Sequence, residues 1–234
     1  MSIRHIIIGL EASELPSNDV KVVKWQLQKY MCKTENEGET MDLIRQVQRY
    51  IPWNEQEEKD REELLLQLRK EDIFLRENKA AHMTASAWVV NYARDRVLMV
   101  YIYDSWSWLG GHADGERDLL SVAVKEVKEE SGIGDVTPLM SDIFSLEILT
   151  VDGHEKNGIY VPSHLHLNVT YLLEADENER TSTKPDENSG VGWFTLEDAV
   201  EASSEPWFRE RIYRKLNRKL AEWTVAGQKK NITV

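Results

Sequence analysis

The chain has 234 residues, and its 41 acidic residues outnumber its 29 lysines and arginines, which gives a formal net charge of −12. This balance argues against a non-specific nucleic-acid binder, which needs an electropositive surface. Hydrophobic residues make up 41% of the chain, enough for a packed core. The length allows one extended domain or two small ones.

The single cysteine, Cys32, permits neither an internal disulfide nor a cysteine-based zinc site. It is consistent with a reducing compartment, and we expect a cytoplasmic location. The longest apolar stretches fall far short of the roughly 20 residues that cross a bilayer. We therefore expect no membrane partner, no signal peptide and no nucleic-acid partner.

The first 80 residues divide into two predicted parts. Residues 1–39 form an N-terminal extension in which 3–10 suit a short strand and 20–31 a helix. Residues 40–80 form a helical segment, with one helix from Met41 to a stop at Pro52 and a charged one over 54–70.

From Thr84 onward the pattern changes to strands and helices of an α/β domain, to which we assign residues 81–234. Residues 85–91 and 97–103 are predicted to pair as a hairpin. Other strands are expected at 144–151, 165–173 and 191–194, and helices at 117–131, 196–202 and 206–223. Thr195 is the expected cap of the helix 196–202.

The last predicted helix, 206–223, has an apolar face and a basic face. Such a helix can bind membranes or nucleic acid, but in an acidic protein we favour a surface helix packed on its own sheet. The residues assigned to its basic outer face are Arg209, Arg211, Arg214, Lys215, Arg218 and Lys219.

Three glutamates share one arc near the end of the predicted helix 117–131. At about 100° per residue, Glu126 lies about 40° from Glu130 and about 60° from Glu129. The like charges repel, and the negative end of the helix dipole disfavours them further. Hard divalent cations, which bind oxygen ligands, would relieve this conflict.

A glycine-rich loop at Gly110 and Gly111 precedes this helix, and its backbone can approach a phosphate closely. Three unrelated surface glutamates would give the same E-x-x-E-E spacing. The glycine loop before the helix and the stop at Gly132 make a metal–phosphate site the better interpretation.

The segment resembles the signature of the Nudix hydrolases, G-x5-E-x7-R-E-U-x-E-E-x-G-U, where U is a bulky aliphatic residue. Gly111 matches the first glycine, and the second half matches without a gap at Glu126, Val127, Glu129, Glu130, Gly132 and Ile133. Flanking segments such as W-S-W-L-G-G-H-A-D-G are similar to one bacterial branch of that family. The resemblance covers about residues 80–225.

Three positions depart from the family pattern. Arg117 stands where the first signature glutamate is expected, with Glu116 beside it. Lys125 replaces the signature arginine and loses its planar, two-pronged donor geometry. Leu109 stands where a proline is usual. These changes bear on rate and metal affinity more than on fold.

The resemblance implies an α/β/α sandwich with a mixed sheet, and hydrolysis of a diphosphate linkage in a nucleoside diphosphate derivative with Mg2+ or Mn2+. It implies metal ligands among Glu126, Glu129, Glu130 and the Gly111 carbonyl, and a catalytic base at Glu129 or Glu187. The residues expected to bind substrate are Gly111, His112, Trp108 and Lys125. A homodimer would be in keeping with the family.

Two other functions stay open. A nucleotide sensor that keeps the fold without catalysis would account for Arg117 and Lys125. A protein-interaction module would depend on residues 1–80. His164 and His166 point to one face of a strand and could ligate zinc, but no third ligand is evident, so a polar or substrate-lining strand face is favoured.

Overall fold

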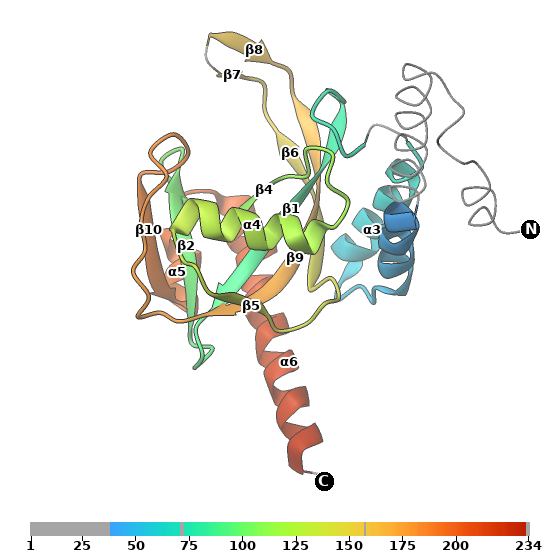
Figure 1. The fold of residues 1–234 in the computed structure, drawn as a ribbon. Coiled ribbons are helices and arrows are strands. Elements are labelled where there is room, and N and C mark those ends of the chain that lie inside the picture. The colour runs from blue at the N-terminus through green and yellow to red at the C-terminus, as the bar shows by residue number, and fades with distance from the viewer. Residues whose placement is uncertain (1–37, 71–72, 157, 233–234) are drawn as a thin grey trace, which may run out of the picture. The chain divides into compact units, whose positions relative to one another are not determined.

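A computed structural model of the chain describes residues 38–70, 73–156 and 158–232 (Figure 1). The strand and helix expected before residue 32, and Cys32 itself, lie outside these residues. Backbone contacts divide the chain into two units, Met1–Asp42 and Leu43–Val234. The elements described below belong to the second unit, except that the first helix begins at residue 38.

Two helices precede the sheet, as predicted. Residues 38–49 are helical, and α3 spans Glu55–Gln67. The side chain of Asn54 caps α3 by accepting a hydrogen bond of 2.9 Å from the Glu57 backbone N–H. Helix α3 packs against strand β6 (Ser145–Val151), so it forms part of the same folded body as the sheet.

One mixed sheet of eight strands forms the centre of the domain. Its main path runs β10–β2–β1–β9–β5, with β3 paired to β2, β4 to β1 and β6 to β9. The strands beside β6 are β1 (Ala81–Val90), β2 (Arg96–Ile102), β3 (Ser105–Ser107), β4 (Leu109–His112), β5 (Val136–Pro138), β9 (His164–Ala175) and β10 (Gly190–Thr195). A separate hairpin, β7 (His154–Lys156) with β8 (Ile159–Val161), extends beyond the sheet (Figure 1).

Strand β1 lies in the middle of the sheet and pairs with other strands along both of its edges. It pairs in parallel with β9 along its whole length, from Ala81 opposite Leu165 to Val90 opposite Glu174. Along its other edge it pairs antiparallel with β4 and, at Val90, with β2. The predicted hairpin of β1 and β2 is therefore confirmed, but the parallel pairing with a distant strand makes the sheet mixed.

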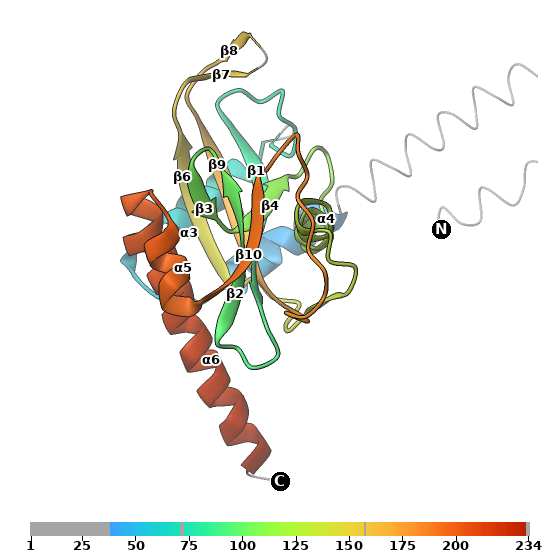
Figure 2. The ribbon, with the colours of Figure 1, turned by 90° about the vertical axis from the view of Figure 1, so that its left-hand side faces the viewer.

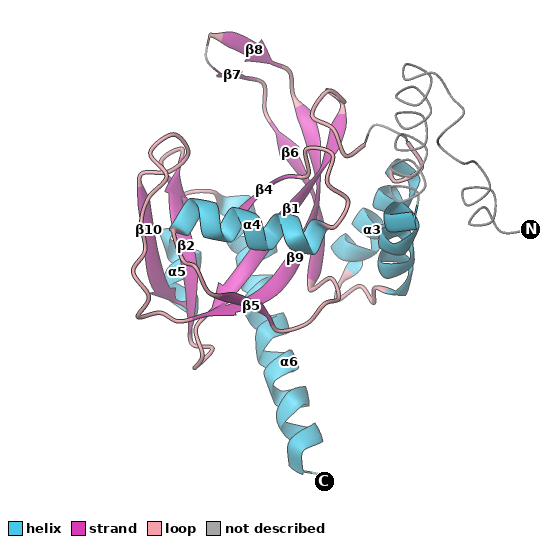
Figure 3. Cartoon of the chain, viewed as in Figure 1, coloured by secondary structure: helices cyan, strands magenta, loops and turns pink. Residues whose placement is uncertain are grey.

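Helices cover both faces of the sheet, which confirms the predicted sandwich (Figures 2 and 3). Helix α4 (Leu119–Ser131) lies on one face. Helix α5 (Leu196–Ala202), the π-helical turn η1 (Phe208–Tyr213) and α6 (Arg214–Ile232) lie on the other. The predicted cap of α5 is confirmed, since Thr195 Oγ1 accepts a hydrogen bond of 3.1 Å from the Asp198 N–H.

The basic outer face expected on the last helix is partly wrong. Lys215 is 3% exposed, and its Nζ lies 3.0 Å from Glu57 Oε1 and 2.7 Å from Glu147 Oε1. Lys219 also reaches Glu57 Oε1, at 2.8 Å. Two buried carboxylates from other elements offset the cost of burying these ammonium groups, which is why the helix can turn them inward.

Within the described residues, no helix has the length and apolar character required to span a membrane.

Candidate active site

Helix α4 has defined ends that fix the position of its acidic arc. At its start, Asp118 accepts a hydrogen bond of 3.2 Å from the Ser121 N–H. At its end, Gly132 adopts a left-handed conformation with φ of 74°, and its N–H donates to the Lys128 carbonyl at 3.0 Å. The inner face packs on the sheet through Ala123 and Val127, which are both fully buried.

Glu130 is the buried member of the arc, with 4% of its surface exposed. The Gly110 N–H donates a hydrogen bond of 2.9 Å to its Oε2 atom. Burial, together with the charges of Glu126 and Glu187, raises the pKa of Glu130 to about 8, although the Gly110 bond works in the opposite direction. A carboxylate in this environment favours a nearby positive charge.

Glu126 lies directly against Gly111. A β-carbon built on Gly111 would fall 2.5 Å from Glu126 Cδ, so a larger residue there would displace this carboxylate from its observed position. Burial raises the pKa of Glu126, and the charge of Glu129 adds to this rise. Lys125 Nζ lies 3.6 Å from Glu126 Oε1, and its charge partly offsets this rise in the pKa of Glu126.

Glu129 is the most exposed of the three glutamates, and two lysines lie beside it. Lys184 Nζ is 3.2 Å from its Oε2 atom, and Lys125 Nζ is 3.5 Å from its Oε1 atom. The hydrogen bond from Lys184 is the main cause that lowers the pKa of Glu129. The pKa of Glu129 is thus shifted in the opposite direction to the pKa values of Glu126 and Glu130.

The loop over residues 184–188 brings the other predicted acid to this helix. Lys184 Nζ lies 2.9 Å from Glu187 Oε1, so this lysine links Glu187 to Glu129. The buried Asn188 donates a hydrogen bond of 2.9 Å from Nδ2 to the Glu130 backbone carbonyl. Sequence reasoning singled out Glu187 but missed Lys184 and Asn188, which are local to the same K-P-D-E-N stretch.

Trp108, predicted to bind substrate, lies on the opposite face of the sheet from α4. It is 7% exposed, and its ring packs at 5.9 Å from Tyr213 and 6.1 Å from Phe208, measured between ring centroids. An indole enclosed by aromatic rings has no free face on which a base can stack. His112, in contrast, follows Gly111 directly, on the strand that carries the glycine pair.

Arg117, the basic residue at an expected acidic position, is held by the loop before α4. Its Nη1 atom donates to the Gly115 carbonyl at 3.1 Å, and its guanidinium lies 4.8 Å from the centroid of the Phe74 ring. These contacts stabilise the loop that enters the helix.

The donor set on α4 fits a hard divalent cation. Glu126, Glu129 and Glu130 present carboxylate oxygens, and burial, followed by neighbouring acidic charges, raises the pKa of Glu126 and Glu130. Lysines compensate Glu129 but leave Glu130 without a direct cationic contact among the described ion pairs. A divalent ion would balance this charge.

Comparison with known proteins gives a family. A family model described as NUDIX domain matches residues 81–216, which is more than half of the chain. A search among curated proteins found no match.

Several solved structures resemble the chain weakly. A Caenorhabditis elegans Ap4A hydrolase complex has 18% identity, covers 62% of this chain and 98% of its own, and has a TM-score of 0.42. The Escherichia coli dihydroneopterin triphosphate pyrophosphohydrolase has 14% identity, coverages of 57% and 92%, and a TM-score of 0.43. A NUDIX-family hydrolase from Clostridium perfringens has 20% identity, coverages of 61% and 97%, and a TM-score of 0.41.

Proposed function

The chain belongs to the Nudix family of pyrophosphohydrolases, and we propose that it uses a divalent metal ion to cleave a diphosphate linkage in a nucleoside diphosphate derivative. The observation that carries the proposal is the convergence of two carboxylates of α4, those of Glu126 and Glu130, on the glycine pair of β4. The Gly110 N–H donates a hydrogen bond to the Glu130 carboxylate. Gly111 has no side chain, and the Glu126 carboxylate occupies the space beside it.

We assign the metal to Glu126, Glu129 and Glu130, with the Gly111 carbonyl as a further oxygen donor. The family uses Mg2+ or Mn2+, and such an ion, when bound, neutralises phosphate charge and polarises phosphorus. The chain itself holds the carboxylates in place through the helix caps and the Gly110 N–H.

Two carboxylates are candidates to take the proton of the attacking water. Glu129 is kept ionised by Lys184, which supports it as the base. Glu187 lies at the other side of the same lysine. Lys125 flanks the carboxylates, and we propose that it contacts the phosphate groups of the substrate.

The test is phosphate release from a panel of nucleoside diphosphate derivatives and nucleoside triphosphates, with a coupled phosphatase. Each reaction is run with Mg2+, with Mn2+ and with chelator. The Glu130→Gln variant is compared with Glu58→Gln, a matched change at an exposed glutamate of α3. We expect chelator-sensitive turnover of one substrate class that is lost only in Glu130→Gln.

Turnover that survives the chelator, or that is equal in the two variants, would contradict the proposed metal site. Turnover of a diphosphate compound without a nucleoside, added to the panel as a further substrate, would contradict the proposed substrate class. Absence of turnover together with a nucleotide-induced thermal shift would favour the sensor function instead.

A further inference from the structure

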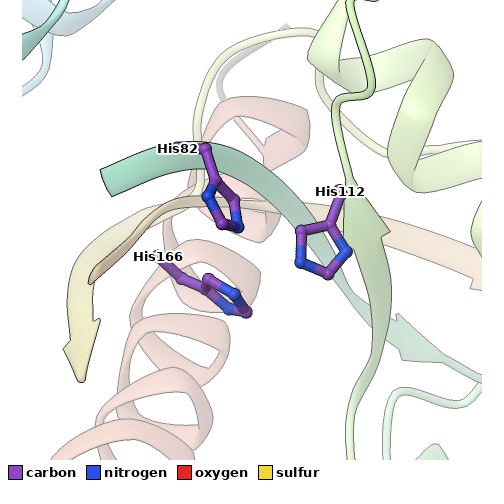
Figure 4. Close-up of side chains that lie close together, drawn as sticks. All are labelled: His82, His112 and His166. Atoms are coloured by element: carbon purple, nitrogen blue, oxygen red, sulfur yellow. The ribbon is translucent and has the colours of Figure 1, made fainter. Parts of the chain in front are cut away.

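Histidines from three strands meet at one place on the sheet. His82 lies on β1, His112 on β4, and His164 and His166 on β9. The strand register explains the meeting, because His82 pairs with His166 and Thr84, two residues after His82, pairs with His112. Figure 4 shows the rings of His82, His112 and His166 facing one another.

The ring nitrogens are close enough to share one ion. Ligand atoms of His82, His112 and His166 all lie within 4.8 Å of one another. His164 joins them, since its Nε2 atom lies 3.2 Å from Nε2 of His166 and its ring centroid lies 4.9 Å from that of His82. A tetrahedral zinc ion with Zn–N bonds of about 2.0–2.1 Å separates its ligand nitrogens by roughly 3.3 Å.

His82 is oriented as a metal ligand. The ring is 5% exposed, and its Nδ1 atom lies 3.1 Å from the Asn78 carbonyl, which accepts a hydrogen bond and so places the proton on Nδ1. Its Nε2 atom is buried and has no hydrogen-bond partner among the described residues. A buried lone pair without a partner is costly, and a metal ion would satisfy it.

His164 repeats the arrangement. Its Nδ1 atom lies 2.9 Å from the Pro162 carbonyl, which leaves the lone pair on Nε2, directed at His166. Backbone carbonyls that bind the second ring nitrogen are the usual outer support of metal-bound histidines. Two of the four rings thus have their proton fixed away from the centre of the cluster.

The charges around the cluster are compatible with a cation. Burial, followed by the neighbouring histidines, lowers the pKa of His166 to about 2, and burial also lowers the pKa of His82. Burial thus favours the neutral form of these rings, which is the form that binds a metal ion. Arg76 and Lys79 are the nearby cations, and Arg76 forms a two-pronged ion pair with Asp114.

We propose that His82, His112, His164 and His166 bind one borderline transition-metal ion of the zinc class, at a site separate from the carboxylates of α4. Imidazole nitrogens favour Zn2+, Cu2+ or Ni2+ over Mg2+, whereas the carboxylate set favours the hard ions. The two sites are therefore distinguished by ligand chemistry, and this inference does not depend on the proposed hydrolysis.

The experiment uses the full chain without an affinity tag, stripped with chelator and then titrated with Zn2+ by calorimetry. We expect one tight zinc per chain in the wild type. His82→Ala and His166→Ala should weaken binding by about 10²-fold or more. His154→Ala, which removes a histidine from the adjacent β7, should bind zinc normally.

Two further measurements keep the test independent of folding and of the carboxylates. Co2+ bound to the wild type should give the visible absorption of a tetrahedral nitrogen site, without any substitution. The triple variant Glu126→Gln, Glu129→Gln, Glu130→Gln should keep the tight zinc. Absence of zinc binding, a cobalt spectrum of an octahedral oxygen site, or binding lost in the triple variant but kept in His82→Ala would each overturn the proposal.

Discussion

Gly111 on β4 and Glu126 on α4 are in direct contact across the sheet–helix interface: a β-carbon on Gly111 would fall 2.5 Å from Glu126 Cδ and 2.7 Å from its Oε2 atom. The strand and the helix are thus fitted to each other at the very residues that carry the proposed metal chemistry.

Gly111→Ala should therefore displace the Glu126 carboxylate. Misplacing a reacting group by about 1 Å can cost about 10²-fold in rate, and we expect a loss of kcat/KM on that order. Gly227→Ala is the matched control, because nothing lies within 4 Å of a β-carbon there. Equal activity of the two variants would show that the tight contact has no role in turnover.

Glu130→Gln should keep the fold but lower turnover by at least about 10²-fold, the scale of losing a main electrostatic stabiliser. The amide still accepts the hydrogen bond from the Gly110 N–H, so the circular dichroism and thermal midpoint should stay close to the wild type. Near-normal turnover in the folded variant would remove Glu130 from the proposed site.

Lys184→Gln should move the acidic limb of the pH–rate profile to higher pH. Lys184 is the main cause of the lowered pKa of Glu129, so removing it lets Glu129 take up a proton at a higher pH. Lys128→Gln, a change on the exposed side of α4, is the control. An unshifted limb would mean that Glu129 is not the group whose ionisation limits the rate.

Lys215→Met should lower the free energy of unfolding. It leaves the carboxylates of Glu57 and Glu147 buried with too little positive charge, and breaking such a cluster costs about 3–5 kcal/mol. Urea denaturation gives the change in free energy of unfolding. Lys59→Met, in an exposed pair with Glu62, should leave the free energy of unfolding almost unchanged.

Glu57 should make the protein sensitive to acid. Burial would raise its pKa, but Lys215, Lys219 and hydrogen bonds outweigh burial and lower the pKa from 4.5 to about 2. A lowered acid pKa stabilises the fold above about pH 4.5, and this contribution is lost as the pH falls toward 2. Glu57→Gln should therefore be less stable than the wild type at pH 7, with a difference that narrows toward pH 2. A difference that is constant with pH would contradict this assignment.

Much of the fold and part of the candidate site could be predicted because their signals are local. The spacing of Glu126, Glu129 and Glu130 and the stop at Gly132 lie within one helix. The Thr195 cap depends on a residue three positions away. Periodicity and capping operate over a few residues, which is why these features were visible in a single sequence.

The features that were missed depend on residues far apart in the chain. The H-L-H pattern at His164 and His166 is visible in the sequence. Only the strand register shows that His82 and His112 lie beside these two histidines. Lys215 was assigned to the solvent face because its neighbours are basic, and only the tertiary fold supplies Glu57 and Glu147 around it. The side chain of Trp108 lies on the face of the sheet opposite α4, where it packs on Tyr213. Its position next to the glycine pair in the sequence does not reveal this.

The buried contact between Glu57 and Lys215 also bears on how the chain is made. Glu57 leaves the ribosome long before Lys215. In the same way, β1 is synthesised well before its parallel partner β9. Contacts of such long sequence separation form slowly. In a nascent chain, Glu57 lacks its lysine partners until α6 emerges, and one edge of β1 lacks its partner until β9 emerges. The domain therefore completes its folding only after α6 has been synthesised, and a chain truncated before α6 is expected to be a substrate for chaperones or proteases.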